Sequence, residues 1–275
     1  GGNYNTVVGD EAGTAITTGD NNTAIGYASL AANTTGSENV AVGQGALDAN
    51  TTAAGNTAVG SDALTANTTG ASNTGIGKNA LEANTTGTES VAVGKSALGS
   101  QTTDTGNVAV GFQALTSHTT SGGGFNVAVG WKALDASTDG HSNVGIGKNA
   151  LGILTTADNN TAVGTSALAV NTSGTYNTAV GSLALENSTT GISNTAVGGQ
   201  ALQTNTTGDY NVAMGVNALD KNTTADNNTG IGAGALAANT TGASNSAVGT
   251  DSLGANTTGA QNTAVGGRSM EATTT

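Results

Sequence analysis

The chain has 275 residues with 44 Gly, no Pro and no Cys, and its 3% aromatic content is too low to fill an ordinary globular core. Its formal net charge of −12 repels phosphate backbones and anionic membrane surfaces, so we expect neither nucleic-acid binding nor membrane insertion. The lack of Cys excludes disulfides and thiolate metal sites, and no apolar run approaches the roughly 20 residues of a membrane-spanning helix.

A short phrase close to T/V-A-V/I-G recurs along the whole chain, with Ala or Gly at its second position everywhere except in the first copy, "TVVG" at 6–9. The glycine that ends each phrase is called the reference glycine below, and fourteen of the fifteen intervals between successive reference glycines are 17 residues. The exception is 19 residues, and we place its two-residue loop expansion within 121–125. Such a fixed short period predicts an all-β fold, a parallel β-roll or β-solenoid of about sixteen 17-residue coils that forms one repetitive shaft over 1–275.

The reference glycines are Gly9, Gly26, Gly43, Gly60, Gly77, Gly94, Gly111, Gly130, Gly147, Gly164, Gly181, Gly198, Gly215, Gly232, Gly249 and Gly266.

Each coil repeats the same residue types at fixed distances from its reference glycine. Asn stands four residues before it in fifteen of sixteen coils, Leu four residues after it in fourteen, and Thr eight residues after it in all. Like residues of stacked coils lie about 4.8 Å apart, so we expect ladders that satisfy their own polar groups along a rod roughly 75 Å long. The glycine itself suits a positive φ at a corner. Representative ladder residues are Asn56, Asn73, Val59, Gly60, Gly77, Leu64, Leu81, Thr68 and Thr85.

The phrase "NTAVG" predicts a short strand in each coil. Because side chains alternate across a strand, Thr57 and Val59 share one face, and Asn56 and Ala58 the other. We expect the β-branched pair to point inward with the Leu, since these are the larger apolar groups. The strictly small Ala or Gly position then faces outward, where it suits close approach by a second chain. A crowded coil interior is the alternative explanation for its small size.

Aromatic and basic residues gather near the single expansion. In four successive coils the residue directly after the reference glycine is Lys or aromatic, and stacking would align these residues on one exposed turn. Cation–π contacts and sugar stacking both fit such a group, so it is a candidate ligand-binding patch; local stabilisation and tolerated turn variation are the alternatives. The candidate residues are Lys95, Phe112, Phe125, Trp131, Lys132 and Lys148.

Other chemistry finds little support in the sequence. His118 and His141 occupy different places in their coils and lack evident catalytic or metal-binding partners, so we interpret both as solvated turn residues. We therefore expect no catalytic residue, no metal and no cofactor. Ice binding by regular Thr ranks is a minor alternative, although adjacent Thr residues in "TT" face opposite sides and so form no paired rank.

The pattern [TV]-A-[VI]-G-x-x-[AS], as in "NVAVGQGAL" at 39–47 and "NTAVGSLAL" at 177–185, resembles the head repeats of YadA-like trimeric autotransporter adhesins. The fuller unit NTAVGxxALxANTTG is similar to repeats of many predicted bacteriophage tail-fibre and bacterial surface proteins. This sequence departs from the adhesin pattern in its longer coil, its Leu and the place of its Asn. The resemblance implies a left-handed β-roll in a homotrimer that is extracellular, on a cell surface or on a virion, and it carries over no catalytic residue.

Together these observations predict a structural fibre or stalk segment and not an enzyme. Such a segment extends and presents a receptor-binding or assembly domain. The chain lacks an initial Met and stops within a repeat at "SMEATTT", so we expect neighbouring domains or partner subunits at both ends. The alternative is that the rod is itself an adhesin, which binds a cell-surface glycan or host receptor through the candidate patch.

Overall fold

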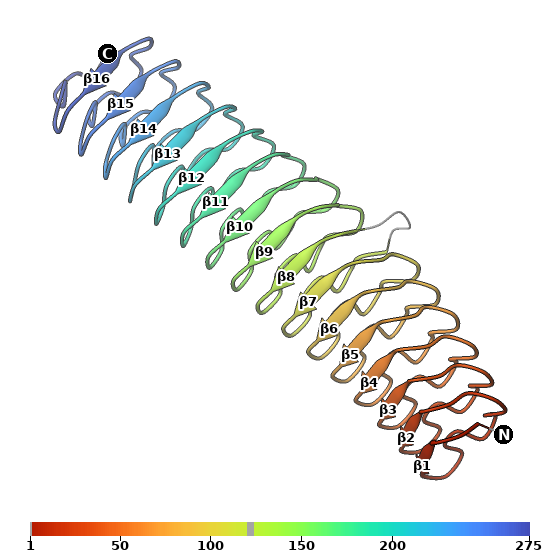
Figure 1. Ribbon diagram of the computed structural model, residues 1–275. Helices are drawn as coiled ribbons and strands as arrows, with labels where there is room; N and C mark the ends of the chain where they lie inside the picture. The colour runs from red at the N-terminus through yellow and green to blue at the C-terminus, as the bar shows by residue number, and fades with distance from the viewer. Residues whose placement is uncertain (1, 120–123) are drawn as a thin grey trace. The chain divides into compact units, whose positions relative to one another are not determined.

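The computed structural model describes residues 2–119 and 124–275, in two units that comprise Gly1–His141 and Ser142–Thr275. Each unit is a parallel β-solenoid in which every coil of about 17 residues contributes one three-residue strand (Figure 1). The described residues include no helix. The predicted all-β solenoid is therefore confirmed.

The strands of the first unit are β1 (Thr6–Val8), β2 (Thr23–Ile25), β3 (Val40–Val42), β4 (Thr57–Val59), β5 (Thr74–Ile76), β6 (Val91–Val93), β7 (Val108–Val110) and β8 (Val127–Val129). Those of the second are β9 (Val144–Ile146), β10 (Thr161–Val163), β11 (Thr178–Val180), β12 (Thr195–Val197), β13 (Val212–Met214), β14 (Thr229–Ile231), β15 (Ser246–Val248) and β16 (Thr263–Val265).

Within each unit, successive strands pair in parallel and in register. Thr57 of β4 lies opposite Thr74 of β5, one repeat further along the chain. Val108 of β7 lies opposite Val127 of β8, so the 19-residue interval leaves the strand register intact. Like residues therefore form columns along each unit, as the repeat predicts. At about 4.8 Å per coil, the eight coils of one unit extend roughly 38 Å.

The Leu four residues after the reference glycine is the largest side chain in the interior of most coils. Leu64 and Leu81 are fully buried, with φ of +53° and +52°. A left-handed backbone costs a non-glycine residue about 1–2 kcal/mol, whereas burying a Leu side chain contributes about 1.5–3 kcal/mol. Burial therefore offsets the conformational cost, and the predicted inward position of Leu is confirmed.

The prediction for the strand faces was wrong. Ala58 and Asn56 are fully buried, whereas Val59 is only partly buried and its neighbour Ile76 is 39% exposed. The interior is too narrow for a β-branched residue: at Gly75 even an added Cβ would lie 3.3 Å from Leu64 Cγ and Cδ1. Small residues occupy this position because the chain's own interior is crowded, so their size is no evidence for a second chain.

Two columns of buried side chains, most of them Asn, link successive coils. The first asparagine column lies four residues before the reference glycine: Asn56 Nδ2 donates to the Gly70 carbonyl at 2.9 Å, and Asn56 Oδ1 accepts from the Asn73 amide at 2.9 Å. The second lies seven residues after it: Asn67 Nδ2 donates to Asn50 Oδ1 and to the same Gly70 carbonyl, both at 2.9 Å. The predicted Asn ladder is thus confirmed, and it is internal.

The Thr and Gly columns also form as predicted. The Thr68 hydroxyl donates to the Thr85 carbonyl of the next coil at 3.0 Å, parallel to the backbone bond from the Thr68 amide at 2.9 Å. Gly60 has a φ of +134°, and an added Cβ would lie 2.7 Å from the carbonyl carbon and oxygen of Gly77. The reference glycine is therefore required both by its backbone conformation and by close stacking.

Candidate functional site

The turn column, which we define as the residues directly after the reference glycines, brings part of the predicted patch together. The Phe112 and Trp131 rings lie 6.4 Å apart between centroids and are nearly parallel, at 15°. Lys95 Nζ lies 5.9 Å from the Phe112 centroid. Phe112 is 38% exposed and Trp131 46% exposed. At Lys95, Phe112 and Trp131, the turn column presents a cationic and aromatic surface to solvent.

The other members of the predicted patch are placed differently. Lys132 Nζ lies 5.3 Å from the Trp131 centroid and 3.4 Å from Asp135 Oδ2, so it belongs to the group. Phe125 precedes β8 whereas Trp131 follows it, and the Phe125 ring lies against Gly106. It therefore does not join the stack. Lys148 belongs to the second unit.

The predicted loop expansion at 121–125 lies partly outside the described residues, which include only Gly124 and Phe125 of it.

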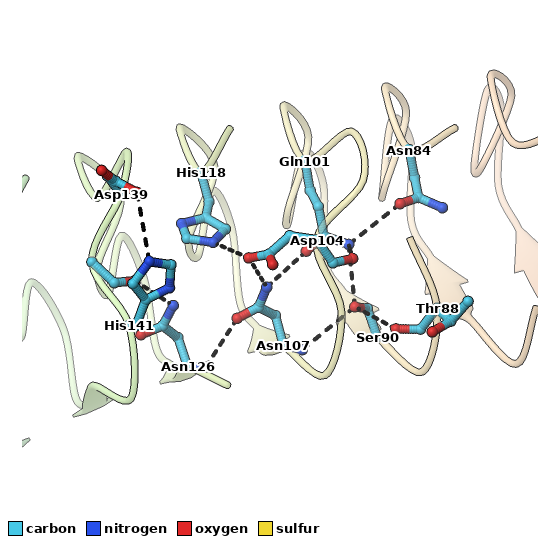
Figure 2. Close-up of polar contacts among 11 residues, drawn as sticks. Asn84, Thr88, Ser90, Gln101, Asp104, Asn107, His118, Asn126, Asp139 and His141 are labelled. Atoms are coloured by element: carbon cyan, nitrogen blue, oxygen red, sulfur yellow. Dashed lines mark hydrogen bonds and ion pairs between the residues drawn. The ribbon is translucent and has the colours of Figure 1, made fainter. Parts of the chain in front are cut away.

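A buried polar cluster near the expansion is the feature that sequence reasoning missed (Figure 2). His118 and Asp104 are fully buried, and His118 Nε2 lies 2.5 Å from Asp104 Oδ2. The interpretation of His118 as a solvated turn residue was wrong. His118 occupies the second asparagine column, and Asp104 replaces the small Gly or Ala found three residues after that column. Aligning these two columns would have placed both side chains in the interior.

The residues around this pair form hydrogen bonds with one another where the two asparagine columns are interrupted (Figure 2). Ser90 interrupts the first asparagine column and Gln101 interrupts the second. Gln101 is one methylene longer than Asn, and its Nε2 lies 3.1 Å from both Ser90 Oγ and the Asp104 carbonyl. Asn107 Nδ2 donates to Gln101 Oε1 at 2.9 Å and to Asp104 Oδ2 at 3.1 Å. Burial of a charged group is tolerable when such bonds accompany it.

His141 lies at the margin of the cluster and is partly exposed. Its ring is 6.5 Å from that of His118, nearly perpendicular at 87°, and its Nε2 lies 3.6 Å from Asp139 Oδ1. The described residues include no group of three or more His, Cys, Asp or Glu placed to hold a metal ion.

Acidic residues dominate the turns of the first three coils. Hydrogen bonding to Glu11 and the negative charge of Glu11 raise the pKa of Tyr27. Partial burial, followed by repulsion from Glu11, raises the pKa of Asp48. This end of the first unit therefore differs in charge from the Lys95 region.

Asp48→Asn is expected to raise the thermal midpoint at pH 7. A raised pKa means that the folded state binds the Asp48 proton more tightly than the unfolded state does. The protonated Asp48 therefore stabilises the fold below the ordinary pKa of about 3.9, and this contribution is lost as pH rises through the raised pKa. The increase in thermal midpoint should vanish near pH 3, where Asp48 is protonated in the wild type as well. Thermal melts of both proteins at pH 7 and pH 3 would measure this difference. Glu38→Gln, on an exposed turn, is the control, and equal gains from both substitutions would contradict the prediction.

The strand face, defined as the first and third residues of every strand, is a second candidate surface. It consists of Val, Ile, Thr, Ser and Met and contains no charged residue. Ile25 is 38% exposed, Ile76 39% and Met214 44%. Contiguous apolar surface of this kind is typical of an interaction site.

The part of the chain that the structure describes contains no helix able to cross a membrane. In comparisons with known proteins, no family model and no curated protein matches this chain.

Proposed function

We propose that this chain is a shaft segment of a fibrous extracellular, cell-surface or virion appendage, which holds a receptor-binding or assembly domain away from its base. The observation that carries this proposal is the hydrogen bonding that recurs from coil to coil. The Asn56 and Asn73 amides each donate to the Oδ1 of the Asn one repeat earlier. The Thr68 hydroxyl donates to the Thr85 carbonyl one repeat later. Each added coil therefore lengthens the stack without a new kind of contact, which suits a spacer.

We further propose that the chains assemble as a homotrimer of left-handed β-rolls, as the resemblance to adhesin head repeats implies. The strand face supports this assembly, in place of the Ala position considered from the sequence. It carries partly exposed Val and Ile side chains along each unit, for example Val59 and Ile76. A copy of the same uncharged face would cover these side chains without burying an unpaired charge.

Sedimentation equilibrium, which gives the mass, and sedimentation velocity, which gives the frictional ratio, test both proposals on the full chain. We expect a mass of three times 26.1 kDa and a frictional ratio well above that of a compact particle. A mass of 26.1 kDa at micromolar concentration would exclude the trimer, and a frictional ratio typical of a sphere would exclude the shaft.

Ile76→Lys is expected to abolish or strongly weaken assembly, because it buries an unpaired ammonium in the proposed interface. The matched control is Ser61→Lys on the turn column, where Lys78 and Lys95 already occur. The control should keep the trimer mass. If Ile76→Lys sediments like the wild type, the strand face is not the interface.

The second candidate function is that the shaft itself is an adhesin. The stack of Phe112 and Trp131 favours it, because these are the only two exposed Phe, Trp or Tyr rings among the described residues that stack on each other.

A further inference from the structure

The basic residues of the first unit are concentrated on one side of a few coils. Its Lys residues are Lys78 and Lys95 on the turn column and Lys132 beside Trp131, and it has no Arg. In contrast, the turns of the first coils carry Asp10 and Glu11. The turns at Lys78, Lys95 and Lys132 are thus locally cationic in a chain whose formal net charge is −12.

The same turns carry the stacked aromatic pair. Lys95, Phe112 and Trp131 follow one another on the turn column in three successive coils. Adjacent coils are about 4.8 Å apart, so an ammonium group and two partly exposed rings form a continuous strip. Among the described residues, Lys132 of this strip forms a salt bridge with Asp135, whereas the exposed Lys95 forms none.

These groups define a ligand chemistry. The apolar face of a pyranose ring packs against aromatic side chains, and a carboxylate binds an ammonium group through charge-assisted hydrogen bonds. At physiological salt the Debye length is about 8 Å, so a ligand with one negative charge senses the nearby Lys residues more than the distant acidic turns. A polyanion would still meet the acidic surface on either side.

We propose that the strip of Lys95, Phe112, Trp131 and Lys132 binds an acidic oligosaccharide, in which a carboxylate-bearing sugar adjoins a neutral pyranose. The neutral ring packs on Trp131 and Phe112, and the carboxylate binds Lys95, because Lys132 already pairs with Asp135. This inference rests on the second candidate function and specifies its ligand; it is independent of the shaft proposal.

Trp131 is the chain's only Trp, so its fluorescence reports directly on the strip. The test titrates the full chain with the oligosaccharides of a glycan panel made of matched pairs, each with and without one carboxylate-bearing sugar. We expect at least one acidic member to shift the Trp131 emission saturably and its neutral partner to bind at least tenfold more weakly. No shift with any acidic member would overturn the proposal.

Variants separate binding at the strip from effects on folding. Lys95→Gln keeps Trp131 as the reporter and should weaken binding at least tenfold with an unchanged thermal midpoint. On an immobilised panel, Trp131→Ala should lose binding, whereas Tyr210→Ala, which removes an exposed aromatic side chain of the second unit, should retain it. Unchanged binding by Lys95→Gln, or tighter binding of an oligothymidylate probe than of any glycan, would overturn the proposal. A trimer that binds no acidic glycan would leave the shaft proposal intact and remove only this one.

Discussion

Gly77→Ala is expected to lower the free energy of unfolding by about 3–5 kcal/mol, because it combines an unfavourable backbone conformation with a backbone clash. Gly77 has a φ of +131°, which L side chains rarely adopt. An added Cβ would lie 2.6 Å from the Gly94 carbonyl oxygen and 2.7 Å from its carbon. Neither atom can move without separating two stacked coils.

Gly199→Ala is the matched control for this substitution. An added Cβ at Gly199 meets no heavy atom within 4 Å, and its φ is outside the left-handed region. The control should change stability by less than about 1 kcal/mol, in the stabilising direction, because Ala restricts the unfolded chain. Thermal melts followed by circular dichroism would measure both variants. Equal midpoints would show that stacking tolerates a side chain at the reference glycine.

The period of the sequence was enough to predict the coils and most of their columns. Thr68, Leu64 and Gly60 recur at fixed distances, and each distance corresponds to one structural role: a hydroxyl bonded to the next coil, a buried side chain and a close backbone contact. Local sequence carries this information because each coil contacts its neighbours through the same positions.

The direction of the strand faces could not be derived from alternation alone. Both faces carry apolar residues, so the two-residue period fits either orientation. An inward Val59 would bury more apolar surface than an inward Ala58. The coil is too narrow for it, because the buried Leu leaves room opposite only for a residue as small as Ala58. The decisive sequence signal was Asn56. It shares the face of Ala58 and recurs in nearly every coil, which an exposed Asn has no reason to do.

The buried cluster was missed because its residues are exceptions to their columns. His118 and Asp104 look unrelated along the sequence, since 14 residues separate them. Only their column positions place both in the interior. The Phe112 and Trp131 stack was predicted because both residues occupy the same exposed column, whereas Phe125 was assigned to it by proximity in sequence and not by column.

Asp104→Gly and His118→Asn, each made alone, are expected to lower the free energy of unfolding by about 3–5 kcal/mol, because each leaves one member of a buried pair without its partner group. His118 Nε2 and Asp104 Oδ2 are 2.5 Å apart, and neither side chain is exposed. The two substitutions introduce the residues that most other coils have at these positions, such as Asn67 and Gly70.

The double variant should recover most of the loss. Its Asn would occupy the second asparagine column, in which Asn67 donates to Asn50 Oδ1 of the preceding coil at 2.9 Å, and the variant buries no ionisable group. Replacing a buried pair of ionisable groups by well-packed neutral residues is often neutral or stabilising. Denaturant unfolding of the four proteins gives the coupling free energy, which we expect to be about 3 kcal/mol or more. If the double variant loses the sum of the two single-variant losses in unfolding free energy, His118 and Asp104 do not interact directly. The more exposed pair of His141 and Asp139, at 3.6 Å, provides the control, since surface ion pairs contribute less than about 1 kcal/mol.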